Sequence, residues 1–278
     1  MERIQKLAFV VNSGKEGASE LVTDLVRVAQ SMGVETTKMS EFPLEEGCLA
    51  GNDACCVIGG DGTLLGVVPE AAREQVPVIG INRGRLGFLT TFSGGEVREN
   101  FSEILKGKFQ ISSRSLLEGE VETGETVLGL NDVLVKAPEH ARIVHLEVYA
   151  DDELVTDYIC DGLIISTPTG STAYNLSAGG PLLQPNADVI AMTPICPHTL
   201  SNRSMIFQDD ITLRIRSCHE EVNLLIAADG QRTLVSGKEP VTIRVSKKKF
   251  PLAQKIGYSH FEILRTKLKW SGGYVERS

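Results

Sequence analysis

The sequence ACCVIGGDGT, residues 54–63, decides the fold of this 278-residue chain. Its five apolar residues are typical of a strand that is buried on both faces, as strands of a parallel sheet are. The glycines that follow end the strand and leave Asp61 as a lone side chain in the loop. Ligands of open parallel sheets bind beyond the carboxyl ends of the strands. The stretch therefore predicts a parallel sheet with a binding loop at 59–63.

Strand and helix patterns alternate on both sides of this stretch. Apolar runs at 7–11 and 76–81 predict two more buried strands. Apolar residues at helical spacing predict helices over 18–30 and 96–106. Alternation of this kind implies a parallel sheet that is covered by helices. We therefore predict an α/β domain over residues 1–110.

Beyond Phe109 the pattern changes to alternation of apolar and polar residues. It is clear at 144–148, 213–216 and 241–245, as expected for strands with one buried face. Short strands separated by Gly, Asp and Pro turns predict an antiparallel, sandwich-like domain over 111–257. In the tail, the spacing of Phe261, Leu264 and Leu268 predicts a final helix.

Composition excludes several classes of function. The formal net charge is −8, which disfavours a nucleic-acid partner, and the lysine run at 247–249 is interpreted as a solvated strand end. No apolar run reaches the roughly 18 residues that cross a membrane, and the first residues lack a signal-peptide pattern. Scattered histidines and unpaired cysteines predict no metal site of the zinc type and a reduced, cytoplasmic protein.

Asp61 is the candidate catalytic residue. Glycines around it let phosphate oxygens approach backbone N–H groups, so Gly59, Gly60, Gly62 and Thr63 are candidate contacts for the phosphate donor. A helix that begins at Thr63 would add a favourable field for an anion. A carboxylate repels phosphate, so it needs a compensating role, such as accepting a proton from a hydroxyl or holding a metal. The alternative is a tight turn in which Asp61 bonds its own backbone.

Two further sets of residues suit a polar, flat ligand. The segment STPTGSTAYNLSAGGP at 166–181 is rich in small polar residues, and its Tyr174 could stack on a base. The alternative is an irregular loop between strands. The pairs Asn131-Asp132 and Asp161-Gly162 and the triplet at 229–231 could recognise a ribose, although each alone also suits a turn.

Together these strings resemble the NAD kinase family. They occur in the family's order: GGDGT at 59–63, LGF at 86–88, ND at 131–132, DG at 161–162, the segment at 166–181, PICPHTLSNR at 194–203 and DGQ at 229–231. The match touches nearly the whole chain, and TPTGSTAY is its most specific part. GGDGT alone is less specific, because lipid kinases of the diacylglycerol kinase type and phosphofructokinases carry related loops.

The resemblance implies a fold, a ligand and partners. The fold is α/β plus β: a Rossmann-like N-terminal domain, completed by the tail at 258–278, and an antiparallel β-sandwich-like C-terminal domain, with NAD between them. It implies Mg²⁺ as the divalent cation, ATP or polyphosphate as the phosphate donor, and a homodimer or homotetramer.

The resemblance also implies roles for single residues. Asp61 matches the proton acceptor of the family. The residues that match NAD contacts are Asp61, Gly62, Phe88, Asn131, Asp132, Arg142, Asp161, Thr172, Ala173, Tyr174, Asn175, Leu176, Ser177 and Gln231. One departure is Gly66, where many members carry a basic residue or His. Arg83 or Arg85 could supply that charge.

The sequence therefore predicts Mg²⁺-dependent phosphoryl transfer to the 2′-hydroxyl of the adenosine ribose of NAD, which gives NADP. Two alternatives are a lipid or sugar kinase of the same superfamily and a non-catalytic NAD(P) sensor. The segment at 166–181 disfavours the first, because a lipid kinase does not need it. The carboxylate of Asp61 disfavours the second, because a sensor has no use for a negative charge beside phosphate.

Overall fold

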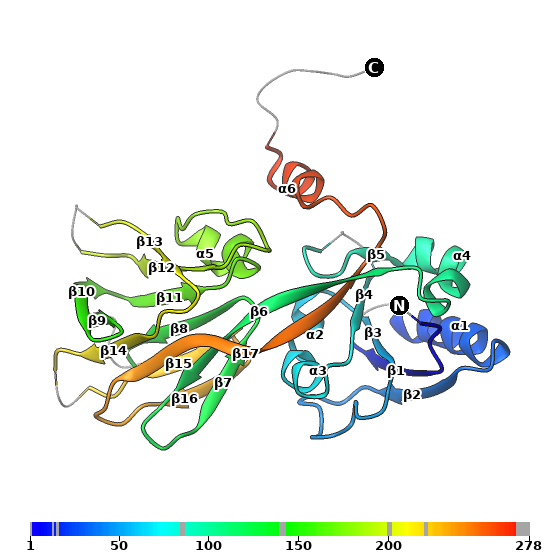
Figure 1. Ribbon diagram of the computed structural model, residues 1–278, viewed down its shortest axis with the longest axis horizontal. Coiled ribbons are helices and arrows are strands. Elements are labelled where there is room, and N and C mark those ends of the chain that lie inside the picture. The colour runs from blue at the N-terminus through cyan, green and yellow to red at the C-terminus, as the bar shows by residue number, and fades with distance from the viewer. Residues whose placement is uncertain are drawn as a thin grey trace.

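The computed structural model describes residues 2–12, 14, 17–83, 87–138, 143–198, 202–219 and 222–270. Within these residues the strands form one eleven-stranded sheet and one six-stranded sheet (Figure 1). No helix in the described part of the chain combines the length and apolar character needed to cross a membrane.

The first part of the chain is a parallel sheet with helices on both faces. Its strands, in order across the sheet, are β4 (Val78–Asn82), β3 (Ala54–Ile58), β1 (Lys6–Val11) and β2 (Glu35–Met39), and the two-residue β5 (Phe92–Ser93) pairs with β4. Phe9 packs in the same apolar cluster as helices α1 (Ala18–Ser31) and α4 (Gly94–Leu105), whereas Val10 packs with α2 (Asp61–Leu65) and α3 (Val68–Glu74). The predicted strands and helices of this part are confirmed, and β2, β5 and α3 are additions.

The second part of the chain is a sandwich of antiparallel strands. The six-stranded sheet runs β13 (Met205–Gln208), β12 (Val189–Ile195), β11 (Gly162–Ser166), β8 (Asp132–Lys136), β15 (Leu225–Ala228) and β16 (Arg232–Val235). It faces β6 (Gln110–Glu120), β7 (Thr126–Gly129), β9 (Val144–Ala150), β10 (Glu153–Cys160), β14 (Leu213–Ser217) and β17 (Val241–Gln254) of the larger sheet. Val133 and Ile165 from one sheet share a core with Leu146 and Ile243 from the other. The predicted sandwich is therefore confirmed.

One strand joins the two parts. Near its start, β17 pairs antiparallel with β14, and at Leu252–Ala253 it pairs parallel with β4. The long strand β6 runs beside it along both segments. The larger sheet is thus continuous from the sandwich into the α/β part (Figure 1). The division near residue 110, with the tail from 258 assigned to the first domain, stays a prediction.

The described part of the C-terminal segment ends in a helix. Helix α6 (His260–Leu268) forms where the tail helix was predicted, with Ile263 and Leu264 buried. Its Lys267 ammonium lies 5.0 Å from the centre of the Phe88 ring. The tail therefore reaches the loop that follows β4, and residues 271–278 lie outside the described part.

We expect Phe101→Ala to destabilise the α/β part strongly. Phe101 is 1% exposed, and its ring centre lies 6.3 Å from that of Phe9. Truncation of a buried Phe leaves a cavity and costs about 3–5 kcal/mol of unfolding free energy. Urea denaturation measures this loss. The matched control Phe261→Ala, at an exposed ring, should change it by less than about 0.5 kcal/mol.

Candidate active site

The glycine-rich loop places Asp61 at the carboxyl end of the central strand β3. Strand β3 ends at Ile58, Gly60 is extended, and helix α2 begins at Asp61. The expected helix start at Thr63 is wrong by two residues, because Asp61 and Gly62 already adopt helical geometry. Asp61 therefore stands in the first turn of the helix, at the edge of the sheet where ligands of such folds bind.

The sequence predicted Asp61 as a lone side chain in the loop, but the structure gives its carboxylate four hydrogen-bond donors among the described residues. Its Oδ2 accepts a hydrogen bond from the backbone N–H of Phe88 at 2.9 Å. Its Oδ1 accepts from the N–H groups of Leu89 at 3.3 Å and Thr90 at 3.0 Å, and from the Thr90 hydroxyl at 2.9 Å. A Cβ at Gly87 would lie 2.0 Å from Oδ1, so only glycine allows this approach. The loop after β4 thus fixes the carboxylate from one side.

The remaining residues of the loop differ in what surrounds them. A Cβ at Gly59 would lie 2.5 Å from the Thr63 hydroxyl, which also accepts a hydrogen bond from Asn12 at 3.2 Å. A Cβ at Gly60 or Gly62 would meet nothing within 4 Å. Gly59 is therefore needed for packing, whereas Gly60 and Gly62 leave open space in front of the backbone.

A turn from the sandwich holds the Asn131–Asp132 pair. The carboxylate of Asp229 accepts hydrogen bonds from three consecutive backbone N–H groups, those of Leu130 at 2.8 Å, Asn131 at 2.7 Å and Asp132 at 3.2 Å. Two residues further on, the Gln231 amide donates to the carbonyl of Gly62 at 3.0 Å. This turn therefore connects the predicted ribose contacts directly to the loop of Asp61.

The TPTGSTAY segment packs on the same pair. The N–H of Thr167 donates to the carbonyl of Asn131 at 2.9 Å, and the Thr167 hydroxyl donates to that of Leu130 at 2.6 Å. A Cβ at Gly170 would lie 1.9 Å from the Asn131 oxygen, so this contact also requires glycine. Asn131 thus lies between the segment and Asp229, and through Gln231 the cluster extends to residue 62.

The residues expected to line adenosine form two short helices, η1 (Gly170–Thr172) and α5 (Tyr174–Ser177). Tyr174 is 45% exposed, Ser177 is exposed, and Thr172, Ala173 and Leu176 are half-buried. Asn175 is fully buried, donates to the carbonyl of Pro181 and accepts from the Thr193 hydroxyl. Its side chain therefore fixes the segment from inside.

One predicted NAD contact, Asp161, does not join this cluster, and another lies outside the described residues. Asp161 is exposed just before β11, at the opposite end of that strand from Ser166, which puts the two roughly 16 Å apart. Arg142 lies outside the described residues. Arg83 lies at the end of β4 and engages in contacts of its own, and Arg85 is also outside the described part.

Burial changes the acidity of the two carboxyls behind the site. The pKa of Asp132, which is 6% exposed, is raised to about 7 by burial and then by the charge of Asp229. Burial also raises the pKa of Asp229 to about 6, against the opposite effect of the three N–H donors. Near neutral pH the pair thus carries less than its full two negative charges, which favours an anionic ligand nearby.

Sequence reasoning missed two residues of this junction. Arg114 of β6 is 4% exposed, hydrogen-bonds Tyr258, and lies 3.5 Å from the Thr169 hydroxyl. Burial raises the pKa of Tyr258, with smaller effects from Arg114 and Asp61, so the phenol lies within electrostatic reach of both. In the sequence, a buried arginine of a strand looks the same as an arginine exposed to solvent. Arg114 therefore could not be recognised from the sequence pattern.

Comparison with known proteins agrees with this geometry. Residues 44–109 match the family model of the ATP-NAD kinase N-terminal domain, and residues 130–255 match that of the C-terminal domain. An NAD kinase of Syntrophotalea carbinolica is 42% identical over 78% of this chain and 78% of its own.

Solved structures share the fold. Yeast NADH kinase complexed with NADH superposes with a TM-score of 0.86 at 21% identity, over 100% of this chain and 91% of that one. An NAD kinase from Archaeoglobus fulgidus in complex with ATP gives a TM-score of 0.79 at 24% identity, over 96% of this chain and 100% of that one.

The loop of Asp61 and these matches define a kinase, an enzyme that transfers a phosphoryl group to an alcohol. More specifically, the chain belongs to the NAD kinase family. Its reaction is phosphorylation of the 2′-hydroxyl of the adenosine ribose of NAD, which yields NADP.

We expect Asp132→Asn to remove a pH-dependent loss of stability. The folded protein holds the Asp132 proton up to about pH 7, whereas the unfolded chain releases it near 3.8, so stability falls as pH rises between these values. Asparagine does not ionise. The Tm of the variant minus that of wild type should therefore be higher at pH 7.5 than at pH 4 by about 2 °C or more, as measured by thermal melts.

The control for that experiment is Asp210→Asn, in an exposed turn. The difference between its Tm and that of wild type should stay the same across this pH range. A Tm difference between Asp132→Asn and wild type that does not change with pH would contradict the assignment.

Proposed function

We propose that Asp61 is the proton acceptor in an in-line transfer of the terminal phosphoryl group of ATP to the NAD 2′-oxygen. The observation that carries this proposal is the way the carboxylate is held. Among the described residues, Oδ1 accepts three hydrogen bonds, whereas Oδ2 accepts one, from Phe88. Oδ2 is therefore the less occupied oxygen, and we assign it to the substrate hydroxyl.

The proton moves late in this mechanism. A carboxylate is a weak base for a sugar hydroxyl, and phosphoryl transfer passes through a loose transition state in which the attacking oxygen still holds its proton. Orientation of the hydroxyl therefore contributes more than basicity does. The donors from residues 88–90 serve this purpose, because they fix the carboxylate without occupying it fully.

The proposed NAD site uses the cluster around Asn131. Adenosine lies along 172–177, with Tyr174 as an exposed aromatic surface and Phe88 near the adenine. Asn131 and Asp132 face the ribose or nicotinamide side, and Gln231 adds a contact beside Gly62. Asp161 and Arg142 remain proposed contacts by family resemblance alone.

Donor phosphates are proposed to lie at Gly59, Gly60, Gly62 and Thr63, where the open backbone of Gly60 and Gly62 leaves room for them. ATP is the proposed donor, as the name of the matched family models and the ATP complex of the Archaeoglobus enzyme suggest. Polyphosphate is the alternative donor.

Mg²⁺ fits this site as an ion held mainly by the substrate. The described residues contain no group of three or more His, Cys, Asp and Glu that could hold a metal. Mg²⁺ in kinases is bound largely through the phosphates of the substrate, so the donor phosphates at 59–63 would hold it, and Asp61 Oδ2 stays assigned to the substrate hydroxyl. When bound, it would neutralise charge on the donor phosphates. We also propose a cytoplasmic enzyme that forms a homodimer or homotetramer.

We expect Asp61→Asn to lose about 10²–10⁴-fold in turnover while NAD still binds. Asparagine keeps the size of the side chain but cannot accept the proton. NADP formation is read with an NADP-specific dehydrogenase, and NAD binding is read by calorimetry. Turnover equal to that of wild type would refute the role of Asp61.

The variant Thr90→Val distinguishes two roles of Asp61, holding the loop at 88–90 and accepting the proton. This change removes the hydroxyl donor to Asp61 but leaves the carboxylate in place. It should cost far less turnover than Asp61→Asn. An equal loss in both variants would mean that Asp61 acts only by holding the loop.

A further inference from the structure

The glycine at position 66, which departs from the family pattern, admits an aromatic ring. A Cβ at Gly66 would lie 2.8 Å from the Cε1 atom of Phe42, which is closer than a real Cβ approaches. The Phe42 ring therefore rests directly on the backbone of residue 66. It is still 42% exposed, so its other surface is free to contact a ligand.

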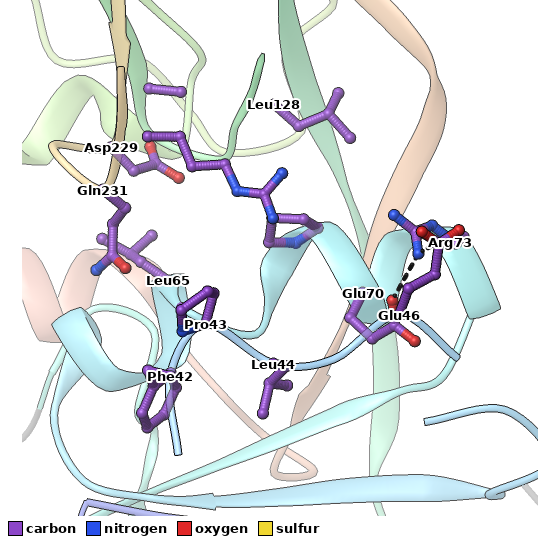
Figure 2. Close-up of a pocket in the computed structure, with 14 residues that line it drawn as sticks. Phe42, Pro43, Leu44, Glu46, Leu65, Glu70, Arg73, Leu128, Asp229 and Gln231 are labelled. Atoms are coloured by element: carbon purple, nitrogen blue, oxygen red, sulfur yellow. Dashed lines mark hydrogen bonds and ion pairs between the residues drawn. The ribbon is translucent and has the colours of Figure 1, made fainter. Parts of the chain in front are cut away.

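This ring forms part of a cavity beside the catalytic helix. The cavity has a volume of about 440 Å³, within the range of small-molecule sites. Figure 2 shows Phe42 and Pro43 on one side and Leu128 on the other, with Gln231 at one end and Arg73 at the opposite end. An aromatic surface between apolar walls suits a flat ring rather than a chain of phosphates alone.

The cavity opens toward the residues that handle phosphate. Leu65 and Gly66, which line it, close the short helix that begins at Asp61. Gln231, at its end, donates to the carbonyl of Gly62 at 3.0 Å. The cavity therefore lies beside the short helix that begins at Asp61 and is linked to Gly62 by Gln231.

Charge along the walls separates a place for phosphates from a place for a base. Arg73 is neutralised by Glu46 at 2.9 Å and Glu70 at 3.2 Å. Arg232 forms no ion pair within the described residues, and it also lines an adjoining cavity with Lys247 and Lys248. Within the described residues, Arg232 is thus a cation of this cavity that no carboxylate neutralises. Glu70 Oε1 is buried and accepts no hydrogen bond from a described residue.

We propose that this cavity binds the nucleoside of the phosphate donor, with its base on Phe42 and its phosphates passing Arg232 toward the 59–63 loop. The proposal rests on the proposed function, since it concerns the donor of that reaction. It predicts tighter binding of a nucleotide than of an inorganic phosphate chain, because the exposed ring of Phe42 would supply stacking energy.

The test compares ATP with inorganic triphosphate, which has the same phosphates and no base. In Phe42→Ala the KM for ATP should rise roughly 5- to 150-fold, the effect of losing one base–aromatic stack. The KM of inorganic triphosphate as a donor, or its inhibition constant as a competitor of ATP, should equal the wild-type value. The KM for NAD should also be unchanged. Phe42→Tyr, which retains the ring, should restore the ATP constant to within about threefold of wild type.

Two further variants complete the design. Arg232→Ala should weaken the binding of ATP and of inorganic triphosphate by similar factors, because it removes a positive charge that the phosphates of both would contact. Phe261→Ala, at an exposed ring on α6, should change neither constant. An unchanged ATP constant in Phe42→Ala, or an equal rise for ATP and inorganic triphosphate, would overturn the proposal.

Calorimetry with ATP in the absence of NAD keeps this result independent of catalysis. Weaker ATP binding in Phe42→Ala supports the cavity even if Asp61→Asn were to retain full turnover. Unchanged binding overturns the cavity assignment and leaves the role of Asp61 to its own test.

Discussion

Hydrogen bonding of the Asp229 carboxylate to three consecutive backbone N–H groups is the constraint on which the site depends. The three donors belong to the turn that enters β8, and the acceptor belongs to the turn that leaves β15, so the contact fixes two neighbouring strand ends against each other. Because Gln231 follows in the same turn and bonds Gly62, the position of the Asp61 loop is set by the same contact. The carbonyl of Asn131 then accepts a hydrogen bond from Thr167, in the TPTGSTAY segment.

Fixed charges at the site follow from this arrangement. Three N–H dipoles point at one carboxylate, and that carboxylate lies close enough to Asp132 to raise its pKa. Burial of the two carboxyls therefore reduces their negative charge at neutral pH. Asp61 is held differently, because the donors of residues 88–90 bond both of its carboxylate oxygens.

Local pattern was sufficient for elements that are buried completely or along one regular face. The run at 54–58 is apolar throughout because both of its faces are buried, and α1 and β9 repeat apolar residues with the period of their buried face. Strand β2 was missed because its residues are mostly exposed and polar. The anchoring of Asp61 by residues 88–90 could not be predicted, since it depends on how closely the turn after β4 approaches β3. The stacking of Phe42 on Gly66 joins residues 24 positions apart and leaves no periodic signal.

The continuity of β17 has a mechanical consequence. Its ladder to β14 and its ladder to β4 belong to one strand, whose register against β6 shifts between Val245 and Lys249, so rotating the sandwich away from the α/β part would disturb backbone hydrogen bonds along the strand. Enzymes that close like a clamshell around their substrates need a compliant linker between rigid bodies. Here the stiff connection favours a cleft whose width is set during folding, and adaptation to each substrate is left to side chains and short turns along its rim.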